Sequence, residues 1–127
     1  MFLTIDSKDK RPIYRQVTDG IRALVARGDL KEGMALPSVR QLAGDLGVNL
    51  NTIAVAYREL QEEGLGEVRH GSGTVVSAPG ARTLADDEVR RPLRNLLAQM
   101  VLGGFSEQRI ESMVRQELEG LRQKGES

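Results

Sequence analysis

The sequence of 127 residues predicts a mainly α-helical protein with one small β-hairpin, and three observations support this fold class. Apolar side chains recur at the three- and four-residue spacing of amphipathic helices in five segments. Residues 65–69 and 74–77 instead have the extended character of short strands around a glycine-rich connection. Helix-capping residues and glycines separate these segments, so their boundaries can be assigned one by one.

The first helix is predicted to open at Pro12, because proline is favoured at the start of a helix, and to end at Gly28. Its apolar stripe consists of Ile13, Val17, Ile21, Leu24 and Val25. Residues 28–36 show no regular spacing and are expected to form a loop. Residues 2–5 alternate in character, which indicates a short strand or arm ahead of the helix.

Two further helices follow, and each has its own capping signal. Ser38 and Gln41 match the S-x-x-Q capping box, which opens a helix directly after Ser38. Gly47 supplies the left-handed residue that commonly ends a helix, and Asn49 is a suitable cap for the next one, which runs until Gly64. The buried face of that helix is expected to carry Ile53, Ala56, Tyr57 and Leu60.

A hairpin completes this part of the chain. Residues 65–69 and 74–77 are the predicted strands, and residues 70–73 form a connection of four residues between them. Three helices followed by such a hairpin make a winged helix-turn-helix, which we place in residues 1–77. In this scaffold the helix after the turn enters the major groove of DNA by its leading turn, and the hairpin is the wing.

These residues resemble the amino-terminal domain of the GntR family of bacterial transcription regulators. The matching segments are PIYRQV (12–17), GDLKEGMALPSVRQLA (28–43), GVNLNTIAVAYREL (47–60), EEGL (62–65) and HGSGT (70–74). The AYREL form and the short tail look most like the YtrA subfamily. The resemblance implies transcription regulation by a DNA-binding repressor, with double-stranded operator DNA as its partner.

The predicted DNA contacts lie at the start of the second helix, in the leading turn of the recognition helix and in the wing. They are Ser38, Arg40, Asn49, Leu50, Asn51, Thr52, Arg69, His70 and Gly71. The resemblance implies that Arg40 contacts DNA and that the wing tip reaches the minor groove. Each polar residue also has a purely structural interpretation, such as a helix cap for Asn49 or a plain loop residue for His70. Many family members carry arginine where this chain has Leu50, and often another at Ala54, so the chain departs from the family there.

The charge balance leaves a second class of function open. The chain has 18 basic and 18 acidic residues, and residues 1–77 carry ten of each. A nucleic-acid-binding domain usually has a basic excess, so the placement of charges must supply the DNA-binding face here. The alternative function is a winged-helix module that binds protein without sequence-specific DNA recognition.

Residues 85–127 form a predicted second domain after a linker over residues 78–84, where proline and glycine interrupt the last strand. Two helices are expected, the first beginning near Arg91 or bending at Pro92, and the second capped by Ser106. So short a hairpin cannot cover its apolar stripes alone, which predicts a homodimer; the competing interpretation is that it folds back on its own winged helix. The predicted dimer contacts are Leu93, Leu96, Leu97, Met100, Ile110, Met113, Val114 and Leu118.

The composition predicts neither an enzyme nor a metal site. One histidine and no cysteine allow no nucleophile–base pair and no metal-ligand cluster to be assembled. The absence of a secretory signal and of a long apolar run predicts a cytoplasmic protein without a membrane partner. No cofactor is predicted, and a small-molecule effector stays open without an assigned site.

Overall fold

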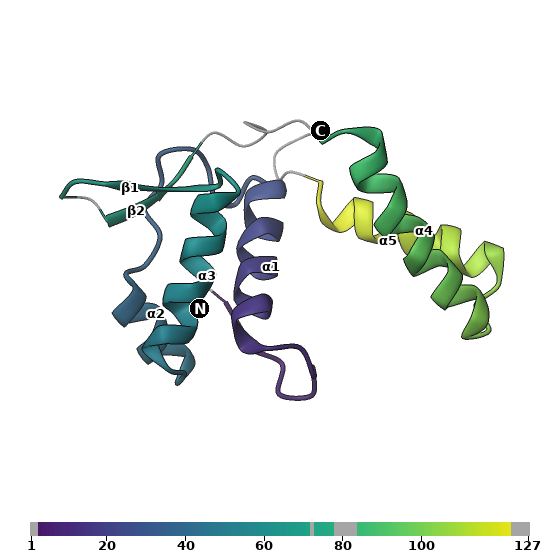
Figure 1. The fold of residues 1–127 in the computed structure, drawn as a ribbon, viewed down its shortest axis with the longest axis horizontal. Coiled ribbons are helices and arrows are strands. Elements are labelled where there is room, and N and C mark those ends of the chain that lie inside the picture. Colours follow the sequence, from purple (N-terminus) through teal and green to yellow (C-terminus); the bar gives the residue numbers. More distant parts are fainter. Residues whose placement is uncertain (1–2, 72, 78–83, 123–127) are drawn as a thin grey trace. The chain divides into compact units, whose positions relative to one another are not determined.

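The computed structural model describes residues 3–71, 73–77 and 84–122, which divide into two compact units (Figure 1). Unit 1 comprises the described residues up to Ser77, and unit 2 comprises residues 84–122. The predicted linker lies outside the described residues except for Leu84, and so do Phe2 and residues 123–127.

Unit 1 consists of three helices followed by an antiparallel hairpin. The elements are α1 (Ile13–Ala26), α2 (Val39–Leu46), α3 (Leu50–Glu62), β1 (Gly66–Arg69) and β2 (Gly73–Val76). Figure 1 shows α1 and α3 side by side, α2 beside the leading end of α3, and the hairpin at the other end of α3. The predicted fold class is therefore confirmed, with strand bounds that differ from the prediction by one residue at one end of β1 and at both ends of β2.

The core of unit 1 lies between the three helices and the base of the hairpin. Its fully buried side chains include Val17, Ile21, Leu42, Ile53, Leu60 and Val76. The predicted apolar stripe of α3 is entirely buried. In α1 the prediction was wrong at Ile13, which is 37% exposed, and it missed Thr18, which is buried. The Thr18 hydroxyl donates a 3.0 Å hydrogen bond to the Arg15 carbonyl, so burial leaves this polar group satisfied.

The segment that precedes α2 is more than the predicted loop. Backbone hydrogen bonds of 2.7–2.9 Å join it to β2, and Ala35 forms an isolated antiparallel bridge with Val75. The donor and acceptor pairs are Gly33 N to Val76 O, Val76 N to Met34 O, and Leu36 N to Thr74 O. The segment thereby ties the base of the hairpin to the residues that lead into α2. Residues 33–36 (Gly-Met-Ala-Leu) lack the alternation typical of a strand, which is why the pattern predicted only a loop.

The amino-terminal segment is an arm and contains no strand over the described residues 3–5, so the strand alternative was wrong. Leu3 is buried and belongs to the core. Gly20 in α1 permits this approach, because a Cβ at that position would lie 2.7 Å from Leu3 Cδ2. The arm therefore packs on unit 1 through Leu3 and the partly buried Ile5, and the Asp6 N–H donates a 3.0 Å hydrogen bond to Gln16 Oε1 in α1.

Unit 2 is a hairpin of two helices, α4 (Asp86–Leu102) and α5 (Glu107–Gly120). The expected start near Arg91 was wrong, since α4 begins at Asp86 and contains Pro92 in its interior. Asp86, Asp87 and Glu88 occupy its first turn, where acidic side chains interact favourably with the helix dipole. The Glu88 carboxylate also accepts a 3.1 Å hydrogen bond from the Ala85 backbone N–H. These contacts stabilise a helical turn ahead of the proline.

The helices of unit 2 bury little apolar surface against each other. Ile110 is the one buried residue that unit 2 has within the described chain. Ser106 caps α5 as predicted, because its side chain accepts a 3.1 Å hydrogen bond from the Arg109 N–H. Within the described ranges, no helix combines the length and the apolar character that crossing a bilayer requires.

Candidate nucleic-acid interface

The turn between α2 and α3 is fixed by capping at both sides. Ser38 Oγ accepts from the Gln41 N–H at 3.0 Å, and Gln41 Oε1 accepts from the Ser38 N–H at 3.1 Å, so the predicted capping box is confirmed. Gly47 ends α2 in the left-handed conformation with φ 67°. Ser38 opens α2 through this box, and its hydroxyl hydrogen is still available as a donor, so its DNA contact stays a prediction.

A buried tyrosine locks α3 against the segment that opens α2. The Tyr57 hydroxyl donates a 2.6 Å hydrogen bond to the Pro37 carbonyl, and the side chain is only 2% exposed. Burial also raises the pKa of Tyr57, which keeps the hydroxyl protonated and able to donate. The position of α2 relative to α3 is therefore set by a specific contact as well as by apolar packing.

The leading turn of α3 presents a mixed polar and apolar surface. Asn49 Oδ1 accepts a 2.8 Å hydrogen bond from the Asn51 backbone N–H, which leaves the Asn49 amide group free to donate elsewhere. Asn49, Leu50 and Asn51 are exposed, whereas Thr52 is half-buried. The first backbone N–H groups of the helix give this end a partial positive charge, which favours an anionic partner.

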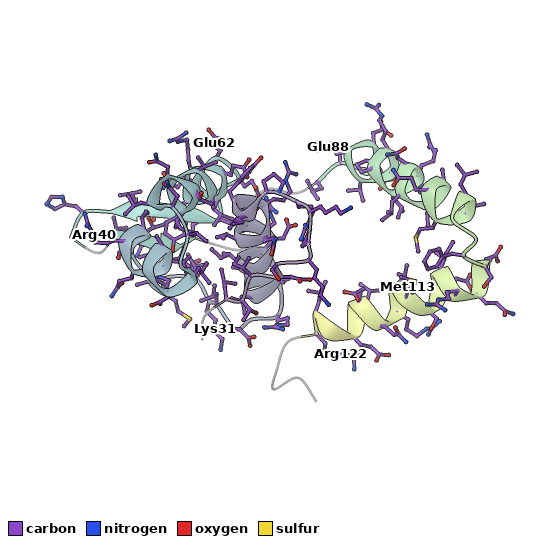
Figure 2. All side chains as sticks on the ribbon, turned by 90° about the horizontal axis from the view of Figure 1, so that it is seen from below. Lys31, Arg40, Glu62, Glu88, Met113 and Arg122 are labelled. Atoms are coloured by element: carbon purple, nitrogen blue, oxygen red, sulfur yellow. The ribbon has the colours of Figure 1, made fainter. Side chains whose placement is uncertain are left out.

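Arg40 lies in the first turn of α2, next to this surface. Its side chain is exposed, and it forms no ion pair or hydrogen bond within residues 3–71, 73–77 and 84–122. Figure 2 shows Arg40 on the side of α2 that faces away from α1. A guanidinium without a protein partner keeps all five of its N–H donors available for a phosphate or a base edge.

The wing contributes the third predicted group of residues. Arg69 pairs with Gly73 across the hairpin, and His70 and Gly71 follow at the exposed tip. Gly71 has φ 82°, a conformation that favours glycine. Arg69 Nε also lies 2.9 Å from Glu67 Oε1 on the same strand, so part of its charge is neutralised, which the sequence pattern did not indicate.

Other acidic residues of unit 1 are engaged away from the leading turn of α3. Arg22 in α1 bonds Asp19 at 2.7 Å and also pairs with Glu63 at the far end of α3, a contact that raises the pKa of Arg22. Arg11 pairs with Asp19 and with Asp9, whose pKa it lowers. These carboxylates are therefore paired with basic neighbours and lie away from the leading turn of α3.

Arg58 lies on the same face of α3 as Leu50 and Ala54, and it was not among the DNA contacts predicted from the sequence. It is exposed on α3 and follows Leu50 and Ala54 at the four-residue spacing that places side chains on one helix face. Among the described residues it has no ion-pair partner. The four-residue spacing that places Arg58 on this face can be read from the sequence. Arg58 nevertheless lies two turns beyond the leading turn, to which the predicted α3 contacts were confined.

Unit 2 presents a different kind of surface, an apolar groove between α4 and α5. The groove has a volume of about 620 Å³ and is lined by Leu93, Leu97, Ile110, Glu111, Val114, Arg115 and Leu118. Among the predicted dimer contacts, Leu93, Leu96, Val114 and Leu118 are 46–64% exposed. Leu97, Met100 and Met113 are half-buried, and Ile110 is buried. Within the described residues, no cluster of three or more His, Asp or Glu side chains is arranged to hold a metal ion.

Comparison with known proteins places this architecture in a family. The sequence model described as "Bacterial regulatory proteins, gntR family" matches residues 13–76. The chain is 31% identical to the HTH-type transcriptional repressor YtrA of Bacillus subtilis over 117 residues, which cover 90% of each protein.

Solved structures agree with the sequence comparison. A transcriptional antiterminator from Listeria monocytogenes has a TM-score of 0.86 and 26% identity, with 100% of this chain and 98% of that chain covered. YtrA from Sulfolobus acidocaldarius, a GntR-family transcription factor, has a TM-score of 0.64 and 38% identity over 77% of this chain and 99% of its own. AraR(DBD) in complex with operator ORX1 has a TM-score of 0.51 and 28% identity, over 61% of this chain and 93% of that one. The chain therefore belongs to the GntR family of bacterial regulatory proteins, in its YtrA-like subfamily.

Proposed function

We propose that the protein is a sequence-specific transcriptional repressor that acts in the cytoplasm and binds an inverted-repeat operator as a homodimer. The observation that carries this proposal is the leading turn of α3, where Asn49, Leu50 and Asn51 are exposed beside the unpaired Arg40. A structurally similar protein, AraR(DBD), is bound to operator DNA, and a similar sequence is a transcriptional repressor. Both findings support DNA as the partner and repression as the outcome.

The proposed contacts divide by chemistry. Arg40 suits a bidentate contact to guanine or to a phosphate, and the Asn51 carboxamide suits adenine. Thr52 and the first backbone N–H groups of α3 suit phosphate, because they lie at the positive end of the helix. His70 and Gly71 form the part of the wing proposed to approach the duplex, with Arg69 behind them.

The homodimer is proposed from unit 2. Four of its predicted dimer contacts are about half exposed, and the two helices of 17 and 14 residues have no further described element of unit 2 to cover them. A second copy of the hairpin would bury these faces in an antiparallel four-helix arrangement. Glu111 and Arg115 line the same groove, and such a pair of opposite charges suits an interface that contacts itself about a two-fold axis.

The dimer also predicts the form of the operator. Two-fold symmetry would present two recognition helices to one side of a duplex, about 34 Å or a multiple of that apart. The half-sites should then form an inverted repeat. A hairpin folded back on its own unit 1 would instead leave a monomer and a single half-site, so the two interpretations differ in operator symmetry.

A protein-binding module is the alternative function, and the zero net charge favours it. Substituting Arg40 by Ala separates the two functions. On a duplex selected by the wild-type chain from randomised DNA, Arg40→Ala should weaken binding by about 1–3 kcal/mol. If Arg40 contacts a phosphate, Arg40→Ala should also reduce the slope of log affinity against log salt concentration by about one unit.

Lys31→Ala is the matched control for this experiment. It removes the same charge from an exposed residue in the segment between α1 and α2, which is not part of the proposed interface. Fluorescence anisotropy at several salt concentrations measures both variants. Equal losses in the two variants would show that general electrostatics, and not the proposed site, governs binding.

A further inference from the structure

The first two turns of α3 expose a short apolar row. Leu50, at the first helical position, is 43% exposed, and Ala54, one turn later on the same face, is half-buried. A single exposed leucine is common on protein surfaces and indicates nothing alone. Here the leucine occupies the helix end that is proposed to enter the major groove, so its exposed area would face base edges.

On α3 itself, the hydrogen-bonding side chains of the leading turn are amides and a hydroxyl, and the guanidinium of Arg40 belongs to α2. Asn51 is exposed, and its side chain makes no hydrogen bond to any residue that the structure describes. A side-chain carboxamide pairs bidentately with N6 and N7 of adenine. The nearest cation on this helix face, Arg58, lies eight residues from Leu50, which is about 12 Å along the helix axis. The leading turn of α3 therefore carries no guanidinium of its own that could read guanine, and any guanine contact by Arg40 would come from α2.

One group in the major groove matches an apolar side chain, the C5 methyl of thymine. We infer that Leu50 and Ala54 read thymine methyl groups, so that the base pairs beneath the leading turn of α3 are A·T pairs. This inference rests on the proposed function, because it requires that α3 enter the groove. It goes further than that function in two assignments. An apolar side chain makes the contact that discriminates thymine, and Asn51 makes a second contact, to adenine.

The test removes the methyl group from the DNA and the apolar side chain from the protein. The probe is the duplex that the wild-type chain selects from randomised DNA, with each thymine of a half-site replaced in turn by uracil. Loss of one buried methyl group should weaken wild-type binding about fourfold for each half-site. In Leu50→Ala the replacement should lose its effect at the thymine that Leu50 contacts, because that contact is already absent, while a thymine contacted by Ala54 should stay sensitive.

Two further variants make the result specific. Leu50→Met keeps an apolar side chain at the first helical position and should retain the difference between thymine and uracil. Arg58→Ala removes a charge from the same helix face and should leave that difference unchanged, whatever it does to total affinity. Circular dichroism on each variant checks that α3 is intact, as expected for changes at exposed positions.

The outcomes distinguish this inference from the proposed function. A sensitivity to uracil that disappears only in Leu50→Ala supports the inference. Two results overturn the inference and leave the proposed function standing. One is a selected sequence in which every thymine can be replaced by uracil without loss of affinity. The other is a sequence in which every sensitive thymine is equally sensitive in Leu50→Ala. Failure of the wild-type chain to enrich any sequence overturns both.

Discussion

At the residue scale, Asn49 shows how one side chain serves both the fold and the proposed interface. Its side-chain oxygen Oδ1 accepts a 2.8 Å hydrogen bond from the Asn51 N–H, while its amide nitrogen makes no hydrogen bond within the described part of the chain. The structure therefore confirms the cap, and the DNA contact stays a prediction. The sequence alone allowed either role, because an asparagine at this position satisfies both patterns.

Two substitutions of Asn49 separate these roles. Asn49→Asp keeps the oxygen that caps α3 but replaces the amide donor by a negative charge, so the free energy of unfolding should stay within about 0.5 kcal/mol of the wild type. Operator binding should nevertheless weaken at least about tenfold, because the charge faces phosphates. Asn49→Ala should lose about 1 kcal/mol of stability. Urea unfolding and anisotropy measure the two effects, and unchanged binding by Asn49→Asp would exclude the contact.

At the element scale, the helices of unit 1 were predictable because capping is local. Ser38 with Gln41, Gly47 and Asn49 each act on residues within one turn, so their signals can be read directly from the sequence. The bridge between Ala35 and Val75 was not predictable, since it joins residues far apart in the chain and has no alternating pattern. Arg58 differs from this bridge, because its four-residue spacing from Leu50 and Ala54 can be read from the sequence although it lies beyond the leading turn.

Two glycines of α2 and its cap test this account of the element. Gly47→Ala should destabilise unit 1 by about 1–2 kcal/mol, because φ is 67° and the cost comes from the backbone alone, with nothing within 4 Å of an added Cβ. Gly44→Ala should stabilise it by about 0.5–1 kcal/mol, since Gly44 lies inside α2 and an added Cβ there also has open space.

Thermal or urea unfolding of both variants gives the comparison directly. Both substitutions add one methyl group, at Gly44 inside α2 and at Gly47 in its cap. If the changes in the free energy of unfolding have opposite signs, the difference comes from the backbone conformation at each position. Destabilisation by both would mean that α2 tolerates no change at either position, and the capping account of its end would be wrong.

At the scale of the whole molecule, unit 2 raises the question of what covers its apolar faces. Of the two predicted alternatives for α4, the start near Arg91 was wrong, because an acidic first turn ahead of Pro92 begins the helix at Asp86. The apolar stripes can be located in the sequence, but a stripe does not identify its partner, and the predicted dimer contacts stay a prediction. For that reason the homodimer is a proposal, although the family follows from comparison over most of the chain.

A pair of charge substitutions tests the homodimer. Leu96→Glu with Leu97→Glu should give a monomer by multi-angle light scattering, because two carboxylates would lose hydration in the proposed interface. The control is Leu102→Glu, since Leu102 is 88% exposed at the end of α4 and does not line the groove. Loss of dimer in the control as well, or an unchanged dimer mass in the double variant, would contradict the proposed interface.

The most direct test of the central claim is hydroxyl-radical footprinting of the wild-type chain on the DNA upstream of its own coding region. Two recognition helices held in a dimer should protect two stretches related by two-fold symmetry, with centres separated by about one helical turn of 10 base pairs or a multiple of it. Protection of a single, unsymmetrical stretch would contradict the dimer. No protection at any DNA sequence tested, including the selected duplex, would contradict the reading of DNA by α3.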